Sequence, residues 1–269
     1  GAVRVYELAG SCGDSVRLRA SDRDPGDRFG AALDLSPAGQ VLVVGAPNED
    51  TRIPVGTNQA APISPNDAGL NVGAAYVFTA DDTDSDGRID WPRRDFLKPR
   101  STFVEASTND NENARFGPSV AVAQAGSAIF VGMPFHDDQP GTRDEAIDAG
   151  AVEAFLRTGT DEWTPGDRIL AREPATSARL GSAVATSDSG FRVVAGAAAQ
   201  AQIRTPAIDG TDTGAARFGV GAVHVYRFDS ANQAWDPLSL VQAPGLANCA
   251  ALAGTGCTDR FGRSVSLTR

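Results

Sequence analysis

The sequence is poor in charged and aromatic residues and lacks long hydrophobic runs. Only 22% of its 269 residues are charged and 7% are aromatic, and no apolar stretch approaches the roughly 20 residues of a membrane-spanning helix. These absences exclude an extended coiled coil, a disordered acidic tail and a spanning helix. Hydrophobic residues make up 41% of the chain, enough for a sizeable core. We therefore expect a folded, soluble protein without membrane insertion.

Basic residues are also in the minority. The chain has 24 Lys and Arg against 34 Asp and Glu, so its formal net charge is −10. A surface of this sign repels a phosphate backbone, and no cluster of Lys or Arg with interleaved aromatics makes a local exception. Nucleic acid is therefore not an expected partner.

Motifs of common enzyme classes are missing as well. The chain has two histidines, His136 and His224, and it contains no nucleophile elbow, His-Glu-x-x-His, Walker loop or dinucleotide fingerprint. Carboxylates are numerous, so a glycosidase-like or lyase-like site stays an open alternative. We favour a protein that is not an enzyme.

What the sequence does contain is an internal repeat. One pattern runs over residues 29–47, 116–134 and 180–198. Each copy opens with Phe-Gly, or Leu-Gly in the third, and ends with Gly-Ala-Pro or a variant at the same spacing, which indicates a tandem repeat. An Arg precedes the opening pair in every copy and again before Phe261. We interpret these arginines (28, 115, 179 and 260) as a buried ring that pairs with Asp or Glu.

A second pattern follows each copy and predicts β-strands. It reads GAAYVF at 73–78, GAVEAF at 150–155 and GAVHVY at 221–226, and each time a Trp follows, at 91, 163 and 235. Apolar residues alternate with a period of two and no stretch has a helical period. Each unit therefore reads as four strands. Because the Trp recurs in register, we interpret it as packing between sheets.

Four-stranded units in tandem are typical of propeller blades. The Phe-Gly … Gly-Ala-Pro units resemble FG-GAP repeats, which form the blades of the integrin α-subunit β-propeller and of many bacterial secreted and surface proteins. The predicted fold class is thus an all-β propeller of four-stranded antiparallel blades. The repeat positions, which we expect to be structural, are Phe29, Gly30, Gly45, Pro47, Phe116, Gly117, Gly132, Pro134, Gly181, Gly196, Phe261 and Gly262.

The repeats divide the chain, taken as a single propeller segment over 1–269, into units. We expect three complete blades, at about 27–106, 107–176 and 177–258, and two partial ones at 1–26 and 259–269. The strand that would complete a fourth blade from the two ends is missing, which favours a segment of a larger propeller. The family resemblance implies a propeller of seven blades. Further blades of the same polypeptide are then possible partners. The alternative is a small closed ring.

The sharpest local motif is an acidic stretch at 82–90. Asp82, Asp84, Asp86 and Asp90 occupy relative positions one, three, five and nine, with the Arg88 carbonyl at seven. Oxygen ligands at this spacing suit calcium, and the spacing resembles the calcium loops of integrin propellers. The stretch follows the third strand, whereas the integrin loops lie between the first two. We predict one Ca²⁺ site; the alternative is a solvated acidic turn.

Long insertions separate the second and third strands of each unit. They cover residues 51–72, 139–149 and 200–220, and Asp50 and Asp137 stand at or just before the first two. Loops this long in a compact repeat predict either a shared binding face or plain decoration.

The three cysteines bear on the compartment. Cys249 and Cys257 lie close enough for a local disulfide, while Cys12 is left over. A disulfide would fit an oxidising compartment; the alternative is three reduced thiols.

The family resemblance supplies the functional expectation. It implies a protein outside the cell or on its surface, a binding and adhesion scaffold that recognises a protein or glycan through loops on one propeller face. Two alternatives remain open. One is a catalytic propeller, polysaccharide-processing or phospholipase-associated, and the other is a purely structural spacer.

Overall fold

The computed structural model describes residues 1–6, 15–21, 24–50, 71–83, 85, 89–100, 113–138, 146–201, 220–242 and 260–267. Over these residues the prediction of an all-β fold is confirmed: fourteen strands form antiparallel sheets, and the only helical element is one short 3₁₀ turn, η1 (Gln124–Gly126). Among these residues there is no helix with the length and hydrophobicity that a membrane span requires.

Three sheets have four strands each, as expected for three complete blades. Strands pair in chain order within every sheet, so each is an up-and-down meander. The first sheet contains β3 (Ala32–Leu35), β4 (Val41–Ala46), β5 (Ala74–Thr79) and β6 (Arg93–Leu97). The second contains β7 (Val120–Val122), β8 (Ala128–Met133), β9 (Ala151–Arg157) and β10 (Trp163–Ile169). The third contains β11 (Leu180–Thr186), β12 (Arg192–Ala197), β13 (Ala222–Asp229) and β14 (Ala234–Gln242).

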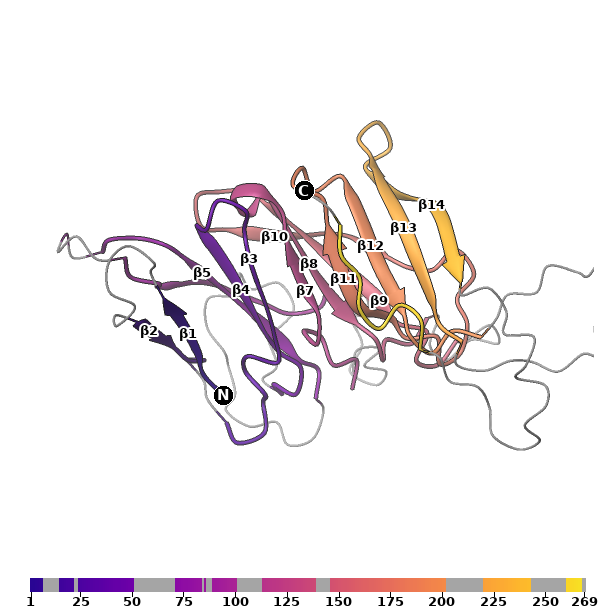
Figure 1. Cartoon of the computed structure of the whole chain (residues 1–269), viewed down its shortest axis with the longest axis horizontal. Coiled ribbons are helices and arrows are strands. Elements are labelled where there is room, and N and C mark those ends of the chain that lie inside the picture. Colours follow the sequence, from indigo (N-terminus) through magenta and orange to yellow (C-terminus); the bar gives the residue numbers. More distant parts are fainter. Residues whose placement is uncertain are drawn as a thin grey trace, which may run out of the picture.

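The two ends of the chain add incomplete units. A two-stranded sheet, β1 (Val3–Tyr6) and β2 (Ser15–Leu18), precedes the first four-stranded sheet. At the other end Phe261 forms a bridge to Gly221, but residues 263–267 form no strand, because no strand of the described residues lies beside them to pair with. Figure 1 shows β1–β2 and β14 at opposite sides of an open fan of sheets, so the described strands do not close into a small ring.

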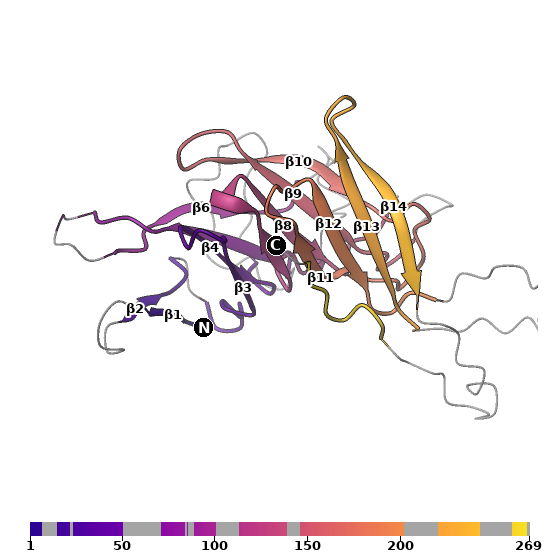
Figure 2. The same ribbon diagram turned by 45° about the horizontal axis from the view of Figure 1, so that its top comes forward.

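The antiparallel order gives the fan two different ends. The turns from first to second strand and the hairpins from third to fourth strand lie at one end of each sheet, which we call the hairpin end. The connections from second to third strand, and from each sheet to the next, lie at the other, which we call the loop end. Figure 2 shows the hairpin of β13 and β14 projecting at the first of these ends. The predicted calcium loop belongs to the hairpin end and the long insertions to the loop end.

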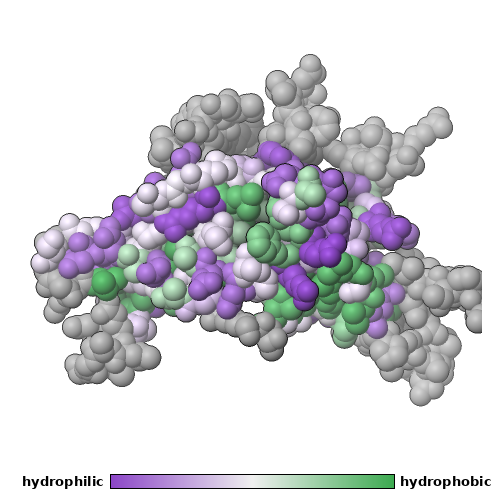
Figure 3. Space-filling model, turned by 90° about the horizontal axis from the view of Figure 1, so that it is seen from above, coloured by the Kyte–Doolittle hydropathy of each residue, from purple (hydrophilic) through white to green (hydrophobic). Residues whose placement is uncertain are grey.

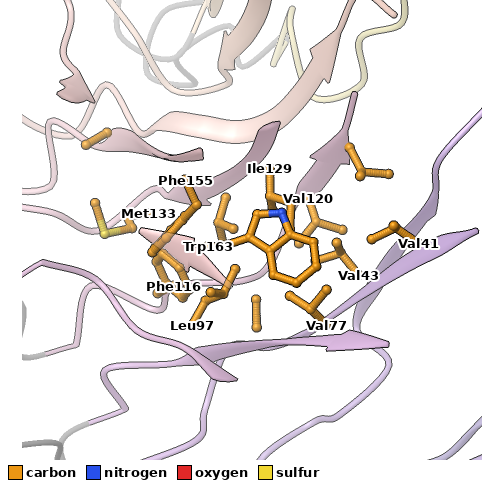
Figure 4. Close-up of a cluster of buried hydrophobic side chains, with 14 of the residues drawn as sticks. Val41, Val43, Val77, Leu97, Phe116, Val120, Ile129, Met133, Phe155 and Trp163 are labelled. Atoms are coloured by element: carbon orange, nitrogen blue, oxygen red, sulfur yellow. The ribbon is translucent and has the colours of Figure 1, made fainter. Parts of the chain in front are cut away.

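Apolar contacts between neighbouring sheets form the core. Strands β4 and β8 are buried along their whole length because sheets cover both of their faces. One cluster joins β1–β2 to the first sheet and includes Phe29, whose ring meets Tyr76 edge-on at 5.2 Å. A second joins the first and second sheets, and Figure 4 shows the Trp163 ring in it beside Val43 and Val77. A third lies between the second and third sheets, where Phe130 meets Trp235 edge-on at 5.4 Å.

The tryptophans pack in these clusters. Trp163 is buried, and its indole Nε1 donates a hydrogen bond to the carbonyl oxygen of Gly126 at 2.7 Å. Trp91 is buried as well, and Trp235 packs against the third cluster from its partly buried position. Burial of an aromatic ring of this kind is worth about 2–3 kcal/mol.

Candidate functional site

The long insertions leave the sheets at one equivalent point. Two residues after each Gly-Ala-Pro segment or its variant, a carbonyl oxygen accepts a hydrogen bond from the amide of the glycine directly before the third strand. The three bonds are Gly73 N to Glu49 O (2.8 Å), Gly150 N to His136 O (2.9 Å) and Gly221 N to Gln200 O (2.9 Å). Each insertion is therefore closed at its base on the loop end. Residues 51–70, 139–145 and 202–219 themselves lie outside the described part of the chain.

The side chains at these base positions are buried and polar. Glu49 forms an ion pair with Lys98, which follows β6. Gln200 Oε1 lies 2.6 Å from His224 Nε2 on β13. Burial lowers the pKa of His224 to about 4, so the imidazole is neutral at pH 7 and its Nε2–H donates to Gln200.

The base of the second insertion contains a buried ionic network. Glu153, in the middle of β9, is fully buried, and its carboxylate lies 2.8 Å from Arg168 Nε and 3.8 Å from Arg100 Nε. Arg168 Nη1 also lies 3.1 Å from His136 Nε2. Burial raises the pKa of Glu153 while the Arg168 charge opposes the rise. Because Arg168 contacts both Glu153 and His136, the network connects the base of the loop to β9 and β10.

Arginine and aromatic side chains meet on the surface of the loop end. The guanidinium carbons of Arg115 and Arg179 lie 4.7 and 4.8 Å from the centroid of the Phe135 ring, each over the ring. Beside them, Asp148 N donates to Asp137 Oδ1 at 2.7 Å. Burial raises the pKa of Asp148, and the Arg179 charge opposes this. Within the described residues neither of the two guanidiniums forms an ion pair with a carboxylate.

The expectation of a buried arginine ring is wrong. Arg28, Arg115 and Arg260 are exposed and Arg179 is half-buried. All four residues have a positive φ, between 50° and 61°, because they sit in the sharp turn at the Phe-Gly or Leu-Gly pair of each unit. This turn lies at the rim of the sheets and not between them, so the side chains reach solvent.

The predicted calcium loop is described only in part. Asp82 and Asp90 are placed, while Asp84, Asp86 and Arg88 lie outside the described residues. Main-chain hydrogen bonds between Asp81 and Asp90 close the base of the hairpin. Asp90 Oδ2 accepts hydrogen bonds from the amide and the hydroxyl of Thr83. Asp82 and Asp90 thus stand at the mouth of one hairpin, and no group of three potential metal ligands occurs among the placed residues alone.

Other predicted residues fall at or outside the edges of the described ranges. Asp50 is the last placed residue before the first insertion. Cys12, Cys249 and Cys257 are not among the described residues. Sequence reasoning missed Lys98, Glu153 and Arg168, which carry no motif; the signal for Glu153 is a lone charge in the apolar segment GAVEAF.

The repeat positions meet across the boundary between sheets. Phe116 is fully buried beside Phe155, with ring centroids 5.9 Å apart. Main-chain bridges join the glycine directly before each third strand to the next unit, namely Gly73 to Phe116, Gly150 to Leu180 and Gly221 to Phe261. The Phe-Gly pair therefore connects one unit to the preceding one.

Comparison with solved structures finds similarity at low identity. Sqt1 from Saccharomyces cerevisiae is 11% identical with a TM-score of 0.38, over 82% of this chain and 37% of that one. A protein from Lactobacillus plantarum is 13% identical with a TM-score of 0.41, over 90% and 50%. A protein of unknown function from Desulfotomaculum acetoxidans is 13% identical with a TM-score of 0.36, over 89% and 62%. The chain thus spans less than two thirds of each.

Comparison with sequences gives one family. No curated protein matches the chain. The model of the FG-GAP repeat matches residues 13–78, which contain the first Phe-Gly and Gly-Ala-Pro pair together with the third strand that follows. The chain therefore carries an FG-GAP repeat, as the residues of its first unit predict.

Proposed function

We propose that this protein is an extracellular or cell-surface adhesion scaffold that binds a protein or glycan ligand through its loop end. The observation that carries the proposal is the common base of the three insertions, each closed by the same glycine-to-carbonyl hydrogen bond. Long loops on a rigid sheet are the usual way in which a repeat fold presents a variable binding surface.

The surface beside these loops has suitable chemistry. Arg115 and Arg179 over the Phe135 ring combine an aromatic contact area with several N–H donors, and arginine and aromatic residues are enriched where binding energy concentrates. At the base of the second insertion, the buried side chains of Glu153, Arg168 and His136 contact one another and are held as a structural network. This arrangement supports a binding role for the loop end over a catalytic one.

The calcium ion belongs to the same proposal but to the opposite end. The ligands would be the side chains of Asp82, Asp84, Asp86 and Asp90 and the carbonyl oxygen of Arg88. The main-chain hydrogen bonds between Asp81 and Asp90 hold the two ends of this stretch together. The ion would offset two of the four negative charges, reduce the repulsion among the carboxylates and stabilise the hairpin. Because this hairpin lies away from the insertions, calcium would act on stability and not by contact with the ligand.

Loop replacement tests the binding role. Residues 51–70, 139–145 and 202–219 are exchanged one at a time for short Gly-Ser linkers, which leaves the glycine-to-carbonyl bonds in place. The control exchanges the hairpin 158–162 at the other end for Asn-Gly. Binding is measured on an array of extracellular-matrix proteins and oligosaccharides. We expect at least one loop exchange to abolish a signal that the control keeps; an array signal unchanged by all three, or no signal from the unaltered protein, contradicts the proposal.

A further inference from the structure

An exposed aromatic side chain stands at the hairpin end of the third sheet. Phe191, in the turn between β11 and β12, is 56% exposed. Its ring is stacked on that of Phe228, with centroids 6.2 Å apart and planes only 9° from parallel. Phe228 in turn contacts Trp235 on β14 at 5.2 Å. The exposed ring is thus held in place by a row of aromatics that begins in the core.

The other two sheets show that the fold does not require these rings. In each sheet one main-chain hydrogen bond joins the first turn to the end of the third strand. The bonds are Phe228 N to Phe191 O (2.9 Å), Ala80 N to Gln40 O (2.8 Å) and Arg157 N to Ser127 O (3.0 Å). At these two backbone positions the first sheet has Gln40 and Ala80, the second has Ser127 and Arg157, and the third has Phe191 and Phe228. Only the third of these sheets places two stacked rings on its surface.

The two rings line a hollow with a polar rim. The hollow measures about 470 Å³, within the range of about 300–1,000 Å³ that small-molecule sites occupy. Arg192, Arg227 and three serines complete the lining, namely Ser187, Ser189 and Ser230. Figure 3 looks down on this end of the molecule and shows hydrophobic residues gathered in patches between hydrophilic ones.

The polar groups of the rim retain hydrogen-bonding capacity. The Arg192 guanidinium forms no hydrogen bond or ion pair with any described residue, and Arg227 lies 3.7 Å from Asp236 with both side chains exposed. Ser187 Oγ and Ser189 Oγ lie 3.1 Å apart and accept main-chain N–H groups of the turn. These bonds fix the hydroxyl oxygens beside the rings, while the guanidinium of Arg192 is left to donate outward.

We propose that this hollow binds a pyranose unit of a glycan. A pyranose ring has an apolar C–H face and a rim of hydroxyl groups. The hollow offers the Phe191 ring for the C–H face, and for the rim the serine hydroxyls of the turn together with guanidinium N–H groups from the opposite face of the two strands. Aromatic contact of this kind is worth about 0.5–1.5 kcal/mol beyond area burial. A hydrogen bond from a charged Arg adds more than a neutral one.

The dimensions favour a sugar over a protein partner. A stable protein interface buries about 800 Å² on each side, whereas this hollow is confined to one turn, one hairpin and the strand ends beside them. The site also lies at the opposite end from the long insertions, so it neither requires nor replaces the binding face proposed there.

The test exchanges Phe191 for the residue that the first sheet uses. Phe191→Gln removes the exposed ring but keeps a side chain that the same backbone tolerates at Gln40, and Ser127→Gln at the equivalent position of the second sheet is the matched control. The full chain and both variants are screened on an array of neutral and acidic oligosaccharides, and the strongest binder is titrated calorimetrically. We expect Phe191→Gln to weaken binding at least about tenfold and Ser127→Gln to leave it unchanged.

Further measurements separate the remaining outcomes. Arg192→Gln should weaken the same oligosaccharide by a smaller factor, and thermal unfolding should show that none of the variants is unfolded. Equal binding by the unaltered protein and Phe191→Gln, or no oligosaccharide bound at all, overturns the proposal. Sedimentation velocity tests whether the exposed ring serves self-association instead. If the unaltered protein forms dimers and Phe191→Gln is a monomer, the patch is a dimer contact and the glycan proposal is overturned. The three loop exchanges should leave the binding of this oligosaccharide unchanged, because the hollow lies at the opposite end from the insertions; a loss of its binding in a loop exchange would assign this ligand to the loop end instead.

Discussion

Gly45 lies so close to Gly117 that a Cβ atom on Gly45 would come within 1.9 Å of the Gly117 carbonyl oxygen. Gly45 is the last residue but one of β4, the second strand of the first sheet, and Gly117 stands at the start of the next unit. The same contact recurs between Gly132 and Gly181 and between Gly196 and Gly262. The two glycine motifs of the repeat are therefore partners across sheets: each Gly-Ala-Pro glycine makes room for the Phe-Gly backbone of the following unit.

Gly45→Ala should destabilise the protein by about 1–3 kcal/mol, because the added methyl meets backbone that cannot rotate away. Urea unfolding of the purified variant measures the change. The control is Gly159→Ala, where the nearest atoms are side-chain atoms of Glu162 at 3.4 Å or more and the expected change is within about 0.5 kcal/mol. Equal stability of the two variants would show that the sheets do not approach one another at Gly45.

Phe116→Ala should lower the free energy of unfolding by about 3–5 kcal/mol, because the side chain is fully buried between two sheets and its removal leaves a cavity. Phe261 occupies the same motif position but is 36% exposed. Phe261→Ala should therefore cost much less, about 1 kcal/mol or below. The urea midpoints of the two variants measure the two losses of stability. Similar losses of stability for Phe116→Ala and Phe261→Ala would contradict the packing described for the Phe-Gly pair.

Stability should fall as the pH drops from about 6.5 to about 4, in part through His224. Burial lowers its pKa to about 4 in the folded chain, whereas the unfolded chain binds the proton near its ordinary value of about 6.5. The unfolded state therefore gains protons first, and the contribution, on the order of 2–3 kcal/mol, is present above pH 6.5 and lost below it.

The comparison of His224→Gln with the unaltered protein isolates this contribution from that of the carboxylates. Unfolding free energies are measured in urea at several values between pH 4 and pH 7. The variant should have a shallower dependence over this interval. Parallel curves would mean that His224 titrates normally in the folded protein.

Calcium should raise the melting temperature if the hairpin at 82–90 binds it. At a concentration 100-fold above the dissociation constant, a site in the folded state alone adds about 2.7 kcal/mol, hence several degrees. Asp84→Ala should abolish the shift, and Asp229→Ala, in the corresponding hairpin of the third sheet, should keep it. If the melting temperature is the same in chelator and in millimolar calcium, the stretch does not bind calcium and is an ordinary acidic turn.

Local patterns predicted most of the strands. The alternation in GAAYVF and its counterparts became β5, β9 and β13, and the segments that end at Gly-Ala-Pro became β4, β8 and β12. Such patterns are readable because strand periodicity concerns neighbours in the chain. The outward direction of Arg115 was not readable, since it depends on a left-handed turn at the rim of two sheets.

The candidate sites were less predictable than the strands. The insertions were visible as long polar segments, but their common closure at Glu49, His136 and Gln200 depends on how the second and third strands align. The ion pair between Glu49 and Lys98 joins residues far apart in the sequence. Phe191 and Phe228 have no motif of their own, and only their shared hydrogen bond reveals them as a pair.

By itself the sequence determined the repeated unit, its four strands and the residues that mark it, because equal spacing and two-residue alternation are local properties of a chain. Tertiary structure alone decided which residues of different units touch. A glycine of one unit contacts a glycine of the next. The loop bases of the first and third sheets contain a buried ion pair and a hydrogen-bonded His, and at the hairpin end of the third sheet an exposed ring is stacked on a second ring. The reason is that the sheets share one backbone plan, while each gap between them is filled by side chains from distant parts of the chain.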